Sequence, residues 1–145
     1  MKTLNPYLTY NGNCEEAFNF YKSILGGELS HLSRFKEMPP MDNCTIPESE
    51  MEKIMHVSLP ISDECVLMGS DSSEAFGQAT VVGNNFALSI SVDTEEEVDR
   101  IFNALAEGGK ITMPASKTFW GSYFGMLIDK FDIQWMVSCA TAEHK

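Results

Sequence analysis

The chain has no long apolar run and few basic side chains. No stretch approaches the ~20 apolar residues that a membrane-spanning helix needs, and no apolar segment of signal-peptide length precedes Pro6. Lys and Arg number 10 against 21 Asp and Glu, so the formal net charge is −11. Nucleic acids and anionic membrane surfaces are bound by clustered Lys and Arg, so we expect neither as a partner. We expect a cytoplasmic protein whose acidity serves solubility.

Motifs of cysteine chemistry are also absent. The cysteines show no C-x-x-C spacing, and a zinc site would need closely spaced ligand pairs. Free thiols are therefore expected rather than disulfides. No G-x-S-x-G or Cys–His signature indicates a nucleophilic hydrolase. The four cysteines are Cys14, Cys44, Cys65 and Cys139.

What the chain does contain is a pattern that occurs twice. Residues 15–27 and 96–109 each begin with acidic side chains, continue with apolar residues at three- and four-residue steps, and end at two glycines. The acidic start suits a helix dipole, the spacing predicts one apolar stripe, and glycine permits the left-handed end of a helix. At 145 residues the chain should form one domain, or two small halves sharing a core.

Each half reads β-α-β-β-β. Asn13 is a candidate N-cap for the first helix, and Thr94 with Glu97 forms a capping box for the second. We expect modules at 1–72 and 85–145, a linker at 73–84 and a long loop at 37–52. One helix covers only one face of a sheet, so the other face must meet a partner or enclose something. The expected strands are 4–10, 28–35, 53–60, 65–70, 86–92, 110–113, 123–128 and 134–140.

Several local motifs carry a family resemblance that spans nearly the whole chain. They lie at residues 5–8, 11–21, 119–121, 125–126 and 129–136. With these motifs in this order, the chain resembles the vicinal oxygen chelate superfamily (glyoxalases, bleomycin-resistance proteins and dioxygenases), and most closely its PhnB-like branch. The resemblance implies an α+β fold of two paired βαβββ modules that form a curved mixed sheet. It also implies a homodimer.

Enzymes of that superfamily hold a divalent metal with four His, Glu or Gln side chains. The resemblance places the matching positions at Pro6, Met68, Phe86 and Met136. Pro and Phe side chains cannot ligate such ions, and a Met thioether is a poor ligand for them. We therefore expect no metal at the usual site, and no cofactor. Relatives are often labelled demethylubiquinone methyltransferases, but the turns at 10–13 and 92–94 lack a G-x-G-x-G pattern, so methyl transfer is not favoured.

Three functions remain open. The first is a metal-free protein that binds a small, partly apolar molecule in the cupped sheet. The second is a divalent-metal-dependent lyase, isomerase or dioxygenase with displaced ligands such as His56, Glu28 or Asp71. The third is a dimer whose second sheet face is simply buried. The sequence assigns no catalytic residue.

Candidate ligand-binding residues are expected at inward-facing positions of the central strands and at the mouth of the cup. Methionine and aromatic side chains would suit an apolar ligand, although methionines also fill ordinary cores. A single strand histidine is usually a hydrogen-bonded structural residue, and its functional interpretation here is a polar contact with the ligand. The candidates are Tyr10, His56, Met68, Phe86, Trp120, Tyr123 and Met136.

Overall fold

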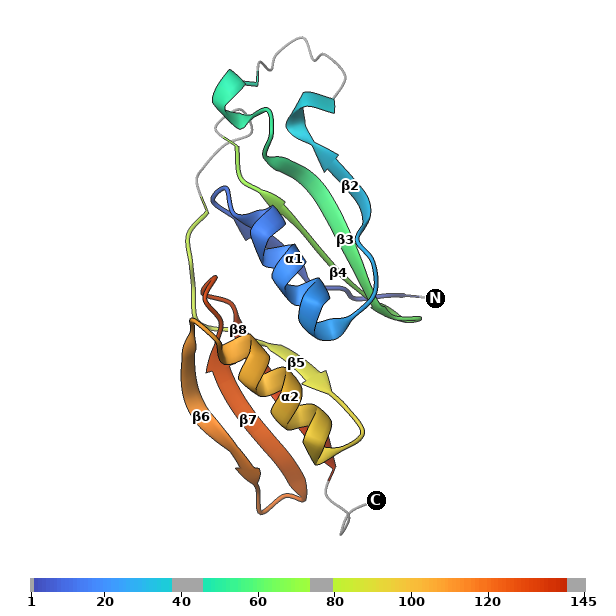
Figure 1. The fold of residues 1–145 in the computed structure, drawn as a ribbon, viewed down its shortest axis with the longest axis vertical. Helices are drawn as coiled ribbons and strands as arrows, with labels where there is room; N and C mark the ends of the chain where they lie inside the picture. The colour runs from blue at the N-terminus through green and yellow to red at the C-terminus, as the bar shows by residue number, and fades with distance from the viewer. Residues whose placement is uncertain (1, 38–45, 74–79, 141–145) are drawn as a thin grey trace. The chain divides into compact units, whose positions relative to one another are not determined.

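A computed structural model of the chain describes residues 2–37, 46–73 and 80–140 (Figure 1). The chain divides into two compact units, Met1–Val81 and Val82–Lys145, called unit 1 and unit 2 below. The elements of unit 1 are β1 (Tyr7–Tyr10), α1 (Cys14–Leu25), β2 (Ser30–Arg34), β3 (Ile54–Ser62) and β4 (Cys65–Asp71), with 3-10 turns at Phe35–Glu37 and Glu48–Glu50. Those of unit 2 are β5 (Leu88–Ser91), α2 (Glu95–Ala106), β6 (Lys110–Lys117), β7 (Ser122–Ile128) and β8 (Gln134–Ala140).

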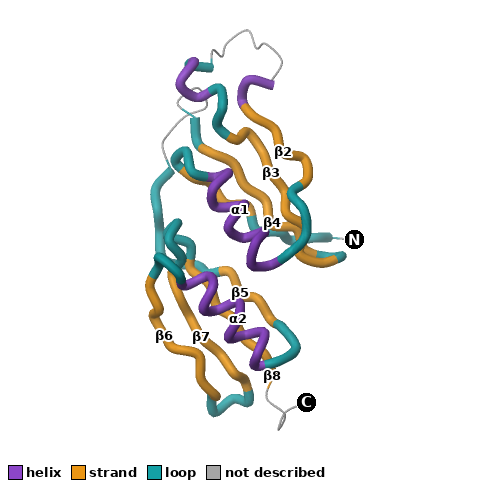
Figure 2. The backbone as a smooth tube through the Cα atoms, viewed as in Figure 1, coloured by secondary structure: helices purple, strands orange, loops and turns teal. Residues whose placement is uncertain are grey.

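Each unit is a four-stranded mixed sheet with one helix across one face (Figures 1 and 2). The strand orders are β1-β4-β3-β2 and β5-β8-β7-β6, and in both sheets the first and fourth strands pair in parallel. The predicted α+β fold and its duplicated βαβββ module are therefore confirmed. Within the described part of the chain, no helix is long and apolar enough to cross a membrane.

Several strand boundaries differ from the prediction. β3 continues through Pro60, which lies beyond the last β2 partner (Ser30 opposite Ser58), so its missing N–H leaves no ladder bond unmade. β6 continues through Pro114 because it is an edge strand, where proline is tolerated. Parts of the expected loop and linker, at 38–45 and 74–79, lie outside the described residues.

The core of each unit lies between its helix and its sheet. In unit 1, α1 buries Ala17, Phe18, Tyr21 and Ile24; in unit 2, α2 buries Val98, Ile101, Phe102 and Leu105. Each large apolar side chain buried in this way contributes roughly 1.5–3 kcal/mol. The strand side chains beneath them are Leu8, Val57, Leu59 and Leu67 in unit 1, and Leu127, Trp135 and Val137 in unit 2.

One glycine in each sheet lets a helix phenylalanine approach the strand backbone. A Cβ added at Gly69 would lie 2.6 Å from Cε1 of Phe18, and one at Gly125 would lie 2.6 Å from Cε2 of Phe102. Real Cβ atoms essentially never come so close, so each glycine is required by packing.

The two helices begin differently. Asn13 is the N-cap residue of α1, as predicted, but its side chain makes no capping hydrogen bond. The carboxylate of Asp71 instead accepts from the backbone N–H groups of Gly12 and Cys14, each at 2.9 Å. At α2, Thr94 accepts from the N–H of Glu97 at 3.1 Å, as predicted.

Candidate functional site

Side chains alternate between the helix-covered and the helix-free face of each sheet. In unit 1, Tyr7 and Ser58 both lie opposite Met68, so the three share a face, and Gly69 beneath Phe18 identifies the other face as the helix-covered one. We call the helix-free face of this sheet the unit-1 face. Its residues are Tyr7, Thr9, Ser30, Ser33, His56, Ser58, Met68 and Ser70.

The same reasoning defines the unit-2 face. Gly125 lies beneath Phe102 on the helix-covered side, so its neighbours Phe124 and Met126 point the other way. Met126 lies opposite Met136, which in turn lies opposite Ser89. The residues of the unit-2 face include Ser89, Phe124, Met126, Ile128, Met136 and Ser138, and β6 adds Lys110, Met113 and Ser116, which lie opposite Ile128, Met126 and Phe124.

A hydrogen-bonded group centred on His56 occupies the unit-1 face. Nδ1 of the ring lies 3.4 Å from the Tyr7 hydroxyl, and Nε2 lies 3.1 Å from Oγ of Ser58. The Tyr7 and His56 rings are tilted at 34° with centroids 5.8 Å apart. Ser58 is 5% exposed whereas Tyr7 is 48% exposed and His56 is half-buried, so the group is open to a ligand at Tyr7 and at the edge of the His56 ring.

Aromatic and thioether side chains dominate the unit-2 face. Phe124, Met126 and Met136 are half-buried, and α2 covers only the opposite side of their sheet (Figure 1). Trp120, which is 53% exposed in the turn before β7, lies edge-on to Phe124 with ring centroids 5.8 Å apart. The exposed ring of Phe119 meets Trp120 at 5.0 Å. The result is a partly exposed apolar surface bordered by Ser89 and Ser138.

Two predicted site residues lie beneath the helices instead. Tyr10 is 4% exposed and its hydroxyl donates to the Tyr21 hydroxyl at 3.1 Å, within the α1 core. The hydroxyl of Tyr123 donates to Oδ1 of Asp99 on α2 at 2.7 Å. That hydrogen bond is the main cause that raises the pKa of Tyr123 to about 12. Neither residue lies on a helix-free face.

The register corrects two of the positions matched to the family's metal ligands. Tyr7, not Pro6, lies opposite Met68, and Ser89, not Phe86, lies opposite Met136. Phe86 precedes β5 and is 57% exposed, so its apolar side chain was a misleading sign of a strand start. The corrected set of Tyr7, Met68, Ser89 and Met136 again contains no carboxylate or imidazole, and the described residues hold no group of three or more His, Cys, Asp or Glu that could bind a metal ion.

The displaced ligands of the enzyme hypothesis are not brought together. Asp71 is 4% exposed, and its carboxylate accepts from three backbone N–H groups, those of Gly12, Cys14 and Ile54. Glu28 pairs with Lys22 at 3.0 Å, at the opposite end of α1, which at 12 residues spans about 18 Å. His56 lies on the other side of the sheet. No single ion could contact all three.

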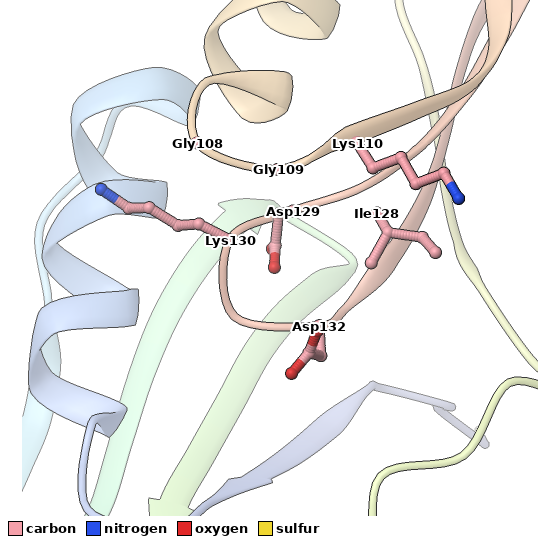
Figure 3. A pocket seen from close by; sticks show the side chains of 7 residues that line it. All are labelled: Gly108, Gly109, Lys110, Ile128, Asp129, Lys130 and Asp132. Carbon is pink, nitrogen blue, oxygen red and sulfur yellow. The ribbon is translucent and has the colours of Figure 1, made fainter.

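One hollow lies entirely within unit 2, where the end of α2 meets the β7–β8 turn (Figure 3). Its volume is about 280 Å³. Asp129 at its edge is 2% exposed and accepts from Nε1 of Trp135 at 2.8 Å and from the N–H groups of Phe131 and Ile133, so it holds the turn together. The role of Asp129 is therefore structural. The lining residues are Gly108, Gly109, Lys110, Ile128, Asp129, Lys130 and Asp132.

The described cysteines, Cys14, Cys65 and Cys139, are free thiols, as predicted; Cys44 lies outside the described residues. Burial of Cys14, reinforced by the negative charges of Asp71 and Glu15, raises the pKa of its thiol far above the usual range. Cys14 is therefore excluded as a nucleophile.

Sequence reasoning missed Tyr7, Ser58, Phe124 and Met126. The alternation of residues 122–128 could have identified Phe124 and Met126 as sharing a face with Met136. Tyr7 was hidden because its contact with His56 crosses β4, a pairing that no local pattern carries.

Relatives of known sequence and structure match nearly the whole chain. Residues 2–138 match the family described as 3-demethylubiquinone-9 3-methyltransferase. Protein YjdN of Escherichia coli K12 is 35% identical over 144 residues, which cover 93% of each chain. The crystal structure of protein PA1353 from Pseudomonas aeruginosa is 39% identical, with a TM-score of 0.83, and the match covers 97% of this chain and 99% of that one.

More distant structures support the same fold. A putative 3-demethylubiquinone-9 3-methyltransferase, PhnB protein, from Bacillus cereus is 27% identical with a TM-score of 0.75, covering 96% and 100% of the two chains. A glyoxylase/bleomycin resistance protein/dioxygenase domain from Frankia is 15% identical with a TM-score of 0.67, covering 99% and 95%, a likeness of fold alone. The chain therefore belongs to the PhnB-like family described as 3-demethylubiquinone-9 3-methyltransferase and has the glyoxalase/bleomycin resistance/dioxygenase fold.

Proposed function

We propose that this protein binds a small, partly apolar molecule on the unit-2 face, without a metal ion. The observation that carries the proposal is the group of half-buried Phe124, Met126 and Met136, which α2 leaves uncovered and which Trp120 borders. Ligand sites are mostly apolar surfaces with a few polar groups that fix orientation. Flexible thioethers adapt to ligand shape, and the Trp120 ring offers a flat partner for stacking.

The polar border supplies orientation. Ser89 and Ser138 lie on the same face and flank the methionines, so their hydroxyls can bond to a ligand whose apolar part rests on Met126 and Met136. Phe86 is a third exposed aromatic ring of the same unit, after Trp120 and Phe119, and remains a candidate contact.

Metal-free binding follows from the donor set. Tyr7, Met68, Ser89 and Met136 occupy the positions that the family resemblance matches to metal ligands, and thioether or hydroxyl groups are weak donors for Mg²⁺, Mn²⁺, Fe²⁺ and Zn²⁺. The methyl transfer named for the family is not proposed, because neither turn before a helix has the glycine-rich pattern of a nucleotide-type cofactor site.

We also propose that the protein acts as a cytoplasmic homodimer. The exposed rings of Phe119 and Trp120, at 95% and 53%, contact each other and form a continuous apolar patch, and such patches mark contact surfaces. Sedimentation equilibrium at micromolar concentration is the test. A strictly monomeric protein would remove this part of the proposal and leave the ligand face intact.

The ligand proposal is tested by labelling the methionine methyl groups with ¹³C and screening small aromatic and aliphatic molecules by NMR. A true ligand should shift the Met126 and Met136 signals and change Trp120 fluorescence. Met136→Ala should lower its affinity about tenfold, since a lost buried contact costs about 1.4 kcal/mol or more. Met51→Ala, at an exposed methionine of unit 1, is the matched control and should leave the affinity unchanged.

Two results would contradict the proposal. In the first, every molecule that binds shifts methionines outside the unit-2 face and ignores Met136→Ala. In the second, the purified protein carries a stoichiometric divalent ion whose removal by a chelator abolishes binding. Trp120→Ala with unchanged affinity would remove only that residue from the site.

A further inference from the structure

We propose that the unit-1 face is a separate binding site for a small oxyanion, a carboxylate or phosphate group, held by Tyr7 and a protonated His56. The proposal rests on the geometry around His56 and is independent of the unit-2 face. It would give the protein a polar recognition site in addition to an apolar one.

The first step is that the imidazole is held in place. Ser58 contacts Nε2 at 3.1 Å and is 5% exposed, so one side of the ring is anchored in a position that solvent scarcely reaches. Tyr7 contacts Nδ1 at 3.4 Å from the adjacent side and is 48% exposed. The ring can therefore act outward only through the Tyr7 hydroxyl and the accessible ring edge.

The second step concerns the proton of Tyr7. A neutral imidazole has one N–H donor and one acceptor nitrogen, so one of the two hydroxyls donates to it. A protonated imidazole donates from both nitrogens and accepts from neither. The Tyr7 oxygen then accepts from Nδ1, and its own O–H must turn toward another acceptor. The most suitable acceptor is an oxyanion, because a positive charge now lies behind the hydroxyl.

The third step is that no carboxylate shares this face among the described residues. β1 presents Tyr7 and Thr9, β4 presents Met68 and Ser70, and β2 places Ser30 and Ser33 opposite Ser58 and His56. The titratable side chains of β2 are the exposed His31 and the half-buried Arg34, neither of which is ever negative.

The acidic groups that adjoin β2 and β3 are directed elsewhere, and one of them, Glu52, pairs with Lys36 at 2.7 Å. Asp71 accepts from backbone N–H groups at the start of α1, and both carboxylate oxygens of Glu15 accept from Arg34, at 3.1 and 2.7 Å. The net charge of −11 repels anions at long range, so millimolar affinity is expected. Hydroxyl groups surrounding one imidazole are a suitable environment for an oxyanion.

The test follows the ring signals of the three histidines by ¹H–¹³C NMR as pH is changed, in chloride, acetate and inorganic phosphate at matched ionic strength. An anion that binds the protonated ring tenfold more tightly raises its apparent pKa by about one unit at saturation. We expect such a rise for His56 in acetate or phosphate, with no matching rise for His31. Acetate and phosphate separate the carboxylate from the phosphate version of the site.

Variants distinguish a built site from a general salt effect. Tyr7→Phe removes the outward donor and should at least halve the anion-dependent shift, while leaving the chloride titration nearly unchanged. Tyr123→Phe makes the same chemical change in unit 2 and should have no effect. Identical His56 titrations in all three salts would overturn the proposal, as would a shift that survives Tyr7→Phe or appears equally in His31. Because the readout lies in unit 1, failure here leaves the methionine experiment on unit 2 unaffected.

Discussion

Units 1 and 2 have the same strand order but very different helix-free faces. The unit-1 face carries an imidazole surrounded by hydroxyls, whereas the unit-2 face carries thioethers and aromatic rings. Beneath the helices the two units are alike: each packs a phenylalanine, Phe18 or Phe102, against a strand glycine. The duplicated side maintains the fold, and the side that differs is where separate functions can reside.

The helix starts show a second difference between the units. α2 is capped by its own neighbour Thr94, three residues before the N–H that it bonds. α1 is capped by Asp71, which lies at the end of β4 and also accepts from Ile54 of β3. Unit 1 therefore links its helix, its central strands and its first turn through one buried carboxylate, and no carboxylate makes such a link in the described part of unit 2.

The largest expected effect comes from breaking the shared packing. Gly69→Ala and Gly125→Ala should each lower the free energy of unfolding by about 2–3 kcal/mol, because the new Cβ overpacks against a helix ring. Denaturant unfolding followed by circular dichroism measures both. The two units should respond alike if the packing is equivalent.

A second substitution sharpens this test. Phe102→Leu removes the ring edge and should partly rescue Gly125→Ala. Phe18→Leu should rescue Gly69→Ala to a similar, partial degree, because backbone atoms crowd both sites: a Cβ at Gly69 would lie 2.9 Å from the Leu8 carbonyl oxygen, and one at Gly125 would lie 3.0 Å from the Cα of Ala115. Full rescue in either unit would show that backbone crowding there is unimportant.

The caps should give a smaller, unequal pair of effects. Asp71→Asn keeps the shape but weakens three charge-assisted hydrogen bonds in a buried position, at a cost of about 1.5–2 kcal/mol. Thr94→Ala removes one exposed cap bond and should cost about 1 kcal/mol. Both are measured by chemical denaturation at pH 7, and equal losses would contradict the distinction between the distant and the local cap.

The fold could be predicted from the sequence because local sequence patterns determine most of it. Acidic starts, apolar stripes and paired glycines predicted both helices, and their repetition predicted the duplicated module. The site was harder to predict from the sequence, because its contacts join strands that are distant in the chain. Tyr7 reaches His56 across an intervening strand, and Asp71 caps α1 from a strand far along the chain. Such contacts depend on register, and the position predicted at Phe86 moved to Ser89 once the pairing with Met136 was known.

The smallest predicted effect is a pH dependence confined to unit 2. The hydrogen bond to Asp99 raises the pKa of Tyr123 to about 12 in the folded state, against about 10 in an unfolded chain. Between these pH values the unfolded chain binds fewer protons than the folded protein. The stability that this hydrogen bond contributes is therefore fully present below pH 10 and is lost as pH rises to 12. The loss should be modest because the pair is solvent-accessible. Asp99→Asn should lower stability slightly at pH 8 and flatten the decline between pH 10 and 12, measured from urea midpoints. If the stability of the variant declines as steeply as that of the parent protein, another group is responsible for the loss. The Tyr123–Asp99 hydrogen bond would then not be a source of pH dependence that distinguishes unit 2 from unit 1.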